Sequence, residues 1–199
     1  MKTHFFLARH GETQWNKLKK LQGQLDSPLT ESGLAQAKQL AASLLAKSLD
    51  LVVSSPLPRA QITAEIASKE LTLPAEVNAG LIERHFGQWQ GSLFADVQDA
   101  EHFSEIFYQV TDYAPPAGES GKAAAARMQA TLAVLAQQKP QQNILIITHG
   151  DILRCFLSQL QDTGFSDAFA LYKNCCVMPV CFDHATQSFL LPCELAESA

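Results

Sequence analysis

Residues 5–16 read FFLARHGETQWN, in which a short apolar run leads into an Arg-His-Gly triplet. A second apolar run leads into another His-Gly pair at residues 144–154, which read ILIITHGDILR. Short continuous apolar runs of this kind are typical of buried strands. In an open α/β sheet the functional groups gather at the carboxyl ends of the strands. We therefore expect His10 and His149 to lie side by side at that edge, as a nucleophile and its partner would.

The rest of the chain alternates strand-like runs with helical periodicity. Further strands are predicted at residues 51–54 and 75–79, and a hairpin is predicted within residues 176–191. The predicted helices cover residues 30–45 with Thr30 as N-cap, 56–69, 120–138 and 151–160, with shorter helical pieces near 15–20 and 93–109. This order predicts an α/β fold of three layers, a mostly parallel sheet with helices on both faces.

Length and composition indicate one globular domain over residues 1–199, with 47% hydrophobic residues. A net charge of −5 gives no general attraction to nucleic acid or to an anionic membrane. The apolar runs are too short to span a bilayer, and the first strand begins too early for a secretory signal. The five cysteines show no C-x-x-C spacing, so we expect reduced thiols and a cytoplasmic location.

Two arginines accompany the two histidines. Arg9 precedes His10, and Arg59 follows the predicted strand at residues 51–54. Guanidinium groups match phosphate oxygens bidentately and stay charged. Two arginines and two histidines that all follow strands therefore predict a phosphate site.

Six motifs occur in an order that makes the chain recognisable. They are LARHGETQWN (7–16), QGQLDSPLTESGLAQA (22–37), SSPLPRAQITAEIA (54–67), LIERHFGQWQG (81–91), PAGES (116–120) and ITHGDILR (147–154). With them the sequence resembles the histidine phosphatase superfamily, also called phosphoglycerate mutase-like, over nearly its whole length. The resemblance implies the phosphoglycerate mutase-like fold and an enzyme that needs neither metal nor cofactor.

The same resemblance implies a role for each matching residue. His10 would be the nucleophile that becomes phosphohistidine, and Glu83 would be the proton donor. The residues expected to hold the transferring phosphoryl group are Arg9, Arg59 and His149. The residues expected to assist substrate binding are Asn16, Gln22, Gly23 and Gly150.

Elementary electrostatics agrees with these roles. Neighbouring arginines lower the pKa of His10 and keep its imidazole neutral, as a nucleophile must be. Glu83 follows two apolar residues, so burial can keep it protonated as a general acid. Glu12 is the competing carboxylate, although its place in the first turn after His10 favours a role as a helix N-terminal charge. Whether His85 lines the site stays open.

Three functions compete: a phosphatase, a phosphoglycerate mutase and a noncatalytic binder of phosphorylated ligands. Residues 84–118 are expected to form a lid-like insertion over the site. This segment contains one basic residue, Arg84, against five acidic ones, and seven of the 16 aromatic residues. An acidic, aromatic lid suits an uncharged leaving group better than a sugar bisphosphate. Hydrolysis of a small-molecule phosphomonoester is therefore favoured, and small α-ribazole-5′-phosphate phosphatases are similar in length. The physiological substrate and the choice between monomer and homodimer stay open.

Overall fold

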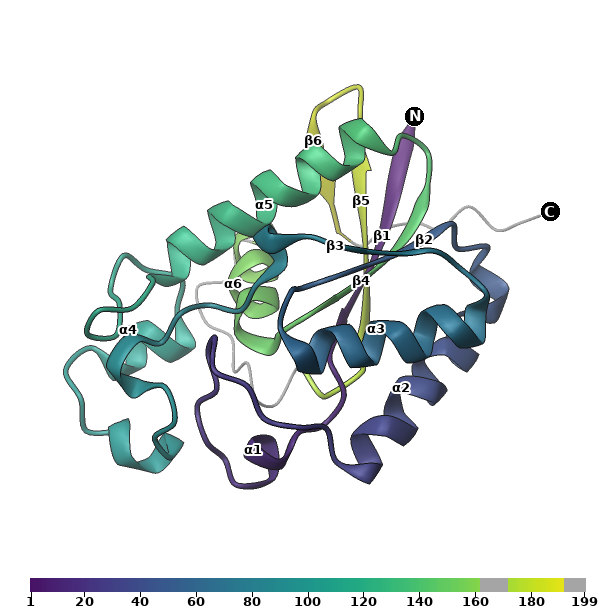
Figure 1. Cartoon of the computed structure of the whole chain (residues 1–199). Coiled ribbons are helices and arrows are strands. Elements are labelled where there is room, and N and C mark those ends of the chain that lie inside the picture. The colour runs from purple at the N-terminus through teal and green to yellow at the C-terminus, as the bar shows by residue number, and fades with distance from the viewer. Residues whose placement is uncertain (162–171, 192–199) are drawn as a thin grey trace.

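The computed structural model describes residues 1–161 and 172–191 (Figure 1). Six strands form one sheet in the order β3-β2-β4-β1-β5-β6. Their bounds are β1 (Lys2–Arg9), β2 (Leu51–Ser54), β3 (Ala75–Val77), β4 (Asn143–Thr148), β5 (Val177–Asp183) and β6 (Ser188–Leu190). β4 runs parallel to both β1 and β2, and β2 runs parallel to β3, whereas β5 is antiparallel to β1 and to β6. The predicted mostly parallel sheet and C-terminal hairpin are both confirmed.

Helices cover both faces of this sheet (Figure 1). α2 (Glu31–Leu44) and α3 (Pro58–Leu71) pack on one face, and α5 (Gly121–Gln138) and α6 (Gly150–Gln161) pack on the other. Side chains of β1 alternate between the two cores, because successive residues of a strand point to opposite faces. Phe5 and Leu7 join the core under α5 and α6, whereas Phe6 and Ala8 join the core under α2 and α3. The predicted three-layer architecture is confirmed.

Helix starts follow local capping chemistry. The Thr30 side chain accepts a hydrogen bond from Gly33 N, as predicted, and the Ser120 side chain accepts one from Ala123 N. These contacts satisfy backbone donors that the first helical turn leaves unpaired. Pro58 is at the start of α3, two residues later than predicted, because its fixed φ suits the first helical turn.

Some boundaries differ from the predictions. β3 ends at Val77 rather than at residue 79, because the Asn78 side chain accepts a hydrogen bond from Gly80 N and starts the 3₁₀ turn η2 (Ala79–Leu81). The helical stretch predicted near 15–20 is the short helix α1 (Gln14–Lys17). α2 ends at Leu44 and continues as the 3₁₀ turn η1 (Leu45–Lys47).

Residues 84–118 contain three short elements and a small apolar core of their own. The elements are η3 (Gly87–Trp89), η4 (Phe94–Val97) and α4 (Phe103–Tyr108). The fully buried members of the cluster are Leu21, Phe86, Val97, Ile106 and Phe107, with further aromatic rings packed around them. Most aromatic surface in this segment therefore stabilises the segment itself. In Figure 1 the segment lies at the end of α5 remote from the chain termini.

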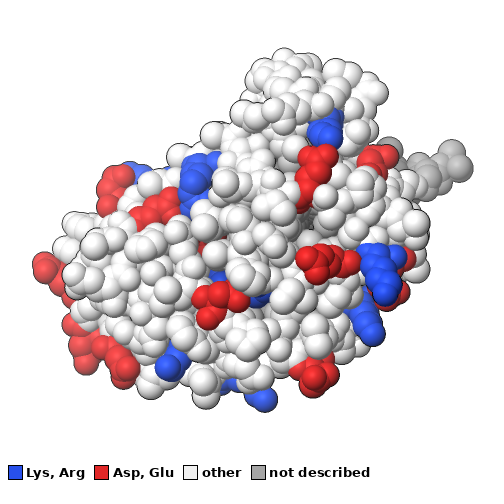
Figure 2. Space-filling view, viewed as in Figure 1, with Lys and Arg blue, Asp and Glu red and all other residues white. Residues whose placement is uncertain are grey.

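One cysteine differs from the predicted reduced state. Cys155, Cys175 and Cys176 are free thiols, but Cys181 takes part in a disulfide, so the expectation of reduced thiols is wrong for Cys181. Within the described ranges, no helix combines the length and apolar character that a membrane crossing requires. Figure 2 shows acidic and basic side chains interspersed over the visible face rather than gathered by sign.

Candidate active site

The carboxyl ends of β1, β2 and β4 meet at one edge of the sheet. His10 N donates to Thr148 O at 3.0 Å, and the His10 and His149 ring centroids are 5.2 Å apart. The prediction that the two histidines lie side by side is confirmed. Ser55 follows β2, and its hydroxyl lies 2.6 Å from His149 Nε2. Parallel register places these side chains together, because each of the three strands ends at the same level.

Hydrogen bonds fix the tautomer of His10. Its Nδ1 lies 2.7 Å from the Gly11 carbonyl, which can only accept, so Nδ1 carries the proton. Arg59 Nε donates to His10 Nε2 at 3.2 Å, which leaves Nε2 with the lone pair. Burial, and then the charges of Arg59 and Arg9, lower the pKa of His10 well below its ordinary value. His10 is therefore a neutral imidazole whose lone pair is on Nε2.

The two arginines are held very differently. The Arg59 guanidinium pairs with Asp26 at 2.9 Å and also donates to the carbonyls of Leu25 and Gly23, so its orientation is fixed. Arg9 donates through Nη1 to Tyr172 O at 2.7 Å. A Cβ atom on Gly150 would lie 3.2 Å from Arg9 Nε, so glycine at this position leaves room for the guanidinium.

Three buried polar atoms lack a hydrogen-bond partner among the described residues: Arg9 Nε, Gln22 Oε1 and His149 Nδ1. Ser55 Oγ accepts from Leu57 N, so its hydroxyl proton is free to donate to His149 Nε2. His149 Nδ1 then carries the ring proton and is an unused donor. Because buried polar groups are almost always paired, two unpartnered donors (Arg9 Nε and His149 Nδ1) and one unpartnered acceptor (Gln22 Oε1) indicate a place for a ligand.

Glu83 closes the amino end of α6. Its carboxylate accepts hydrogen bonds from Arg84 N at 2.8 Å, Ile152 N at 2.9 Å and Asp151 N at 3.2 Å. Burial and the nearby charge of Asp151 raise the pKa of Glu83, and the backbone donors only partly oppose that shift. Glu83 therefore keeps a proton to higher pH than an exposed glutamate, as a general acid requires.

Asp151 is held ionised behind Glu83 by two buried arginines. Burial alone would raise the pKa of Asp151, but Arg154 and Arg84 outweigh it and hold that pKa below its ordinary value. Arg154 Nε lies 2.8 Å from Asp151 Oδ1, and Arg84 Nη1 lies 3.1 Å from Oδ2. The two arginines also donate to the Ile106 carbonyl, which ties α4 to the start of α6.

A small cavity of about 50 Å³ opens among these groups. Eight of the residues predicted for the site line it: Arg9, His10, Asn16, Gln22, Gly23, Arg59, Glu83 and Gly150. The ninth, His149, is fully buried and is not among the residues that line this cavity, but its ring centroid lies 5.2 Å from that of His10. His85 lines neither this cavity nor the larger cavity beside it. Its Nδ1 accepts a hydrogen bond from Gly87 N. The small cavity has room for a phosphoryl group but not for a whole substrate.

A large cavity of about 410 Å³ adjoins the small one and shares Arg9, Asn16 and Lys20 with it. Its other walls come from Glu12, Lys19, Phe94, Tyr108 and Asn174. The Glu12 carboxylate accepts from Thr30 Oγ1 at 2.7 Å and so supports the start of α2. The expectation that Glu12 lies in the first turn of the helix after His10 is wrong, because α1 begins at Gln14 and Glu12 instead contacts Thr30, the N-cap of α2.

Sequence reasoning missed several residues of the site. Asn174 Nδ2 donates to the His10 carbonyl at 2.9 Å and lies 3.3 Å from Asn16 Oδ1, yet no motif surrounds Asn174. Ser55 and Asp151 were within quoted motifs, and their positions directly after a strand and at a helix start were usable signals. Lys20 was missed because nothing in its immediate sequence marks it. In the described ranges, no three His, Cys, Asp or Glu side chains gather as a metal site would require.

Comparison with known proteins agrees with this geometry. The sequence model of the histidine phosphatase superfamily (branch 1) matches residues 5–193. The chain is 34% identical over 157 residues to the adenosylcobalamin/alpha-ribazole phosphatase of Escherichia coli (strain K12), covering 78% of this chain and 77% of that protein. It is 30% identical over 178 residues to a probable phosphoglycerate mutase of Cronobacter sakazakii, covering 88% and 83%. The solved structure of Mycobacterial hydrolase 1 is similar with a TM-score of 0.84 and 28% identity over 100% of both chains.

Proposed function

The chain belongs to the histidine phosphatase superfamily (branch 1), and on that premise we propose that it hydrolyses small phosphomonoesters through a phosphohistidine on His10. One observation carries the proposal: the neutral imidazole of His10 lines a cavity together with Arg9, a buried cation whose Nε has no hydrogen-bond partner among the described residues. A phosphoryl group placed there would meet a nucleophile and an unused positive donor together. In this proposal residues 1–199 act as one domain, and residues 84–118 form a lid-like insertion.

In the first step His10 Nε2 attacks phosphorus and the bond from phosphorus to the ester oxygen breaks. The leaving oxygen takes a proton from Glu83, which becomes a carboxylate. Arg9, Arg59 and the Nδ1–H of His149 hold the negative charge that spreads over the transferring oxygens. Asn16, Gln22, Gly23 and Gly150 complete the wall of the small cavity and assist binding.

In the second step Glu83 removes a proton from water, and the water oxygen attacks the phosphorus of phosphohistidine. The phosphorus–nitrogen bond breaks, inorganic phosphate leaves, and His10 returns to its neutral tautomer while Glu83 is protonated again. The large cavity gives water a route to the intermediate. Hydrolysis therefore needs no acceptor other than water.

The position of Arg84 favours a phosphatase over the second candidate, a phosphoglycerate mutase. A mutase must also bind the carboxylate of its sugar-acid acceptor. Arg84 is the one Lys or Arg in residues 84–118, yet its guanidinium is fully buried and bound to Asp151, Ile106 O and Glu119 O. Residues 84–118 therefore offer no free cation to an acceptor, and the cations that remain at the large cavity, besides Arg9, are Lys19 and Lys20 from outside this segment.

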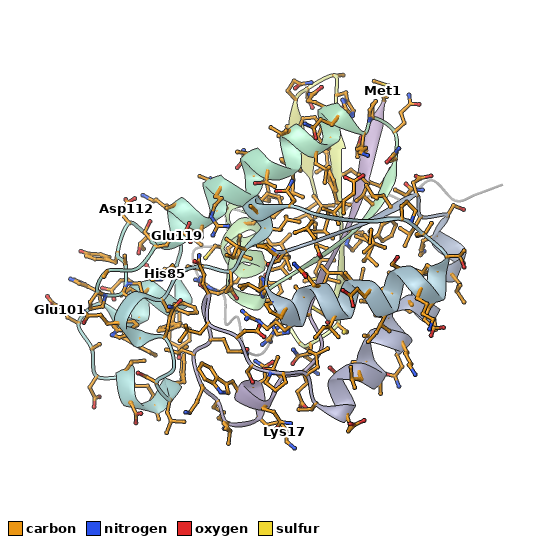
Figure 3. The ribbon with its side chains drawn as sticks, viewed as in Figure 1. Met1, Lys17, His85, Glu101, Asp112 and Glu119 are labelled. Carbon is orange, nitrogen blue, oxygen red and sulfur yellow. The ribbon has the colours of Figure 1, made fainter. Side chains whose placement is uncertain are left out.

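The acidic side chains of residues 84–118 do not supply the argument against a mutase that the sequence suggested. They are Asp96, Asp99, Glu101, Glu105 and Asp112, and none of them lines either of the two cavities. Figure 3 shows Glu101 and Asp112 on the outside of this segment. The idea that their charge faces the acceptor is therefore wrong, because these side chains lie outside both cavities while apolar residues of the segment pack inward.

The experiment that tests the proposal compares hydrolysis with phosphoryl exchange in one purified sample. We expect release of inorganic phosphate from the preferred monoester, with negligible interconversion of 3- and 2-phosphoglycerate. A burst of leaving-group release is expected if dephosphorylation is slow. Robust mutase turnover stimulated by bisphosphoglycerate would overturn the phosphatase assignment. Absence of both turnover and labelling of His10 by ³²P-substrate would identify a noncatalytic binder instead.

Activity is expected to persist in excess EDTA. The positive charge that stabilises the transferring phosphoryl group comes from Arg9 and Arg59, with a further donor from His149. Rates with p-nitrophenyl phosphate before and after dialysis against EDTA check this, and a protein treated with EDTA and then resupplied with Mg²⁺ is the control. Loss of activity that Mg²⁺ restores would contradict the prediction.

α-Ribazole 5′-phosphate is the first physiological candidate to assay. The support is the similarity to the Escherichia coli phosphatase and the aromatic wall of the large cavity. A panel of phosphomonoesters that includes α-ribazole 5′-phosphate, phosphoserine and 3-phosphoglycerate ranks the leaving groups by kcat/KM. The panel also separates a broad phosphomonoesterase, with similar values throughout, from a specific one.

A further inference from the structure

The large cavity bears cations that the sequence did not predict for a leaving-group site. Lys19 and Lys20 both line it, and no ion pair involves either ammonium group among the described residues. Within residues 1–161 and 172–191, the charged side chains that line this cavity are three positive ones, these two lysines and Arg9, and one negative one, Glu12. Glu12 is already engaged with Thr30 Oγ1. The cavity therefore has an excess of positive charge beyond the group that binds the phosphoryl.

Backbone contacts hold the two lysines in place. Lys19 O accepts from Phe94 N at 2.9 Å, and Lys20 pairs with Leu93 in an isolated antiparallel bridge. Lys19 has φ +54°, a left-handed conformation that a residue other than glycine adopts only where its surroundings hold it. Lys20 Nζ lies 5.3 Å from the centroid of the Trp15 ring. The backbone at both lysines is thus held by Leu93 and Phe94, while the side chain of Lys19 is exposed.

An aromatic wall faces the same space. Phe94 and Tyr108 line the large cavity, and both rest on Phe103, at 5.3 Å and 5.9 Å between ring centroids. Both rings therefore line the cavity while packed against Phe103. The volume of about 410 Å³ lies within the range of small-molecule sites, roughly 300–1,000 Å³. A flat ring would therefore have both the room and the contact surface that it needs.

We propose that the preferred substrate is a phosphomonoester whose leaving group joins a flat ring to a second anionic group, a carboxylate or a phosphate. This inference rests on the proposed phosphatase function. The phosphoryl group occupies the small cavity, the ring lies against Phe94 and Tyr108, and the second anion is bound by Lys19 and Lys20. It revises the expectation of an uncharged leaving group, because the acidic side chains that suggested it lie outside both cavities. α-Ribazole 5′-phosphate has the ring without the second anion, and 3-phosphoglycerate has the anion without the ring.

The test uses matched esters with closely similar leaving oxygens. 4-Carboxybenzyl phosphate and its neutral carbamoyl analogue differ in charge only, and trans-4-carboxycyclohexylmethyl phosphate keeps the charge without the flat ring. 4-(Phosphonomethyl)benzyl phosphate carries a phosphonate as the second anion and so separates phosphate from carboxylate recognition. We expect kcat/KM for the better anionic benzyl ester to exceed that of the carbamoyl ester at least about fivefold, a preference that shrinks as salt screens the lysines.

A variant pair locates the charge effect. Lys19→Gln is expected to lower the ratio of anionic to neutral ester towards one. Lys17→Gln is the matched control, because Lys17 lies on α1 two residues away, is exposed, and lines neither cavity (Figure 3). Equal effects of the two variants would overturn the assignment of Lys19. Phe94→Leu is expected to lower the preference for the benzyl ester over the cyclohexylmethyl ester.

Failure of the inference can be told from failure of the proposed function. If wild-type protein hydrolyses the neutral and anionic esters equally well, or prefers α-ribazole 5′-phosphate to both anionic benzyl esters, the inference is wrong and the phosphatase function stands. If no ester is hydrolysed and His10 is not labelled, the proposed function is wrong. Calorimetric binding of 4-carboxybenzylphosphonate against its carbamoyl analogue then still decides whether the large cavity selects a second anion, and equal affinities would overturn that selection.

Discussion

His10→Ala is expected to abolish turnover, with a loss of more than about 10⁴-fold, because it removes the imidazole that is proposed to form the covalent intermediate. The loss should exceed the effect of removing a general acid, which is typically about 10²–10⁴-fold. Steady-state hydrolysis of p-nitrophenyl phosphate measures the loss. Trapping with ³²P-labelled substrate measures whether the acid-labile, base-stable phosphohistidine disappears with it.

The matched control for this variant is His102→Ala. His102 lies on the surface between Glu101 and Glu105 and lines neither cavity. Wild-type activity is expected there, and thermal melts show whether His10→Ala is folded. Labelling that persists in a folded His10→Ala protein would place the nucleophile elsewhere.

Glu83→Gln is expected to lower kcat/KM for alkyl phosphates by about 10²–10⁴-fold, because glutamine cannot deliver a proton to the leaving oxygen. Aryl phosphates such as p-nitrophenyl phosphate should lose less, since their leaving oxygen needs less protonation. The two substrate classes therefore separate the acid role from a general loss of structure. Glu101→Gln is the control, because it makes the same change at an exposed glutamate in residues 84–118 (Figure 3).

The pH profile gives a second readout for Glu83. Burial and Asp151 raise its pKa, so the proton needed for the first step is present at low pH and is lost as pH rises through that raised pKa. The wild-type alkaline limb for alkyl esters should be absent in Glu83→Gln. The acid limb should lie well below pH 6.5, because the pKa of His10 is lowered well below that value. Near-normal alkyl phosphatase activity in Glu83→Gln would contradict the assignment and make Glu12 the next acid to test.

Local sequence patterns predicted most of the fold and the central residues of the site. The apolar runs of β1, β2 and β4, the N-cap Thr30 and the strand-terminal positions of His10 and His149 depend on near neighbours in the chain. A parallel sheet then brings strand ends together without further information. These features could be predicted because pattern and topology together leave few alternatives.

Contacts between distant segments could not be predicted in the same way. Glu83 accepts hydrogen bonds from residues 68 and 69 positions away at the start of α6, and Asn174 reaches His10 across 164 positions. The large cavity combines side chains from α1 and the turn after it, η4, α4 and Asn174. No local pattern marks such residues, because their meeting depends on how loops pack against finished strands and helices.

The sequence by itself determined that two histidines and two arginines meet at the carboxyl edge of a mostly parallel sheet. Only the tertiary structure decided that the lone pair of His10 is on Nε2, that Arg84 binds Asp151 and lines neither cavity, and that Lys19 lines the large cavity. The physical reason is that residue type and strand order determine at which strand end a residue lies. Its protonation, its partner and the space before it are set by the groups that burial brings around it.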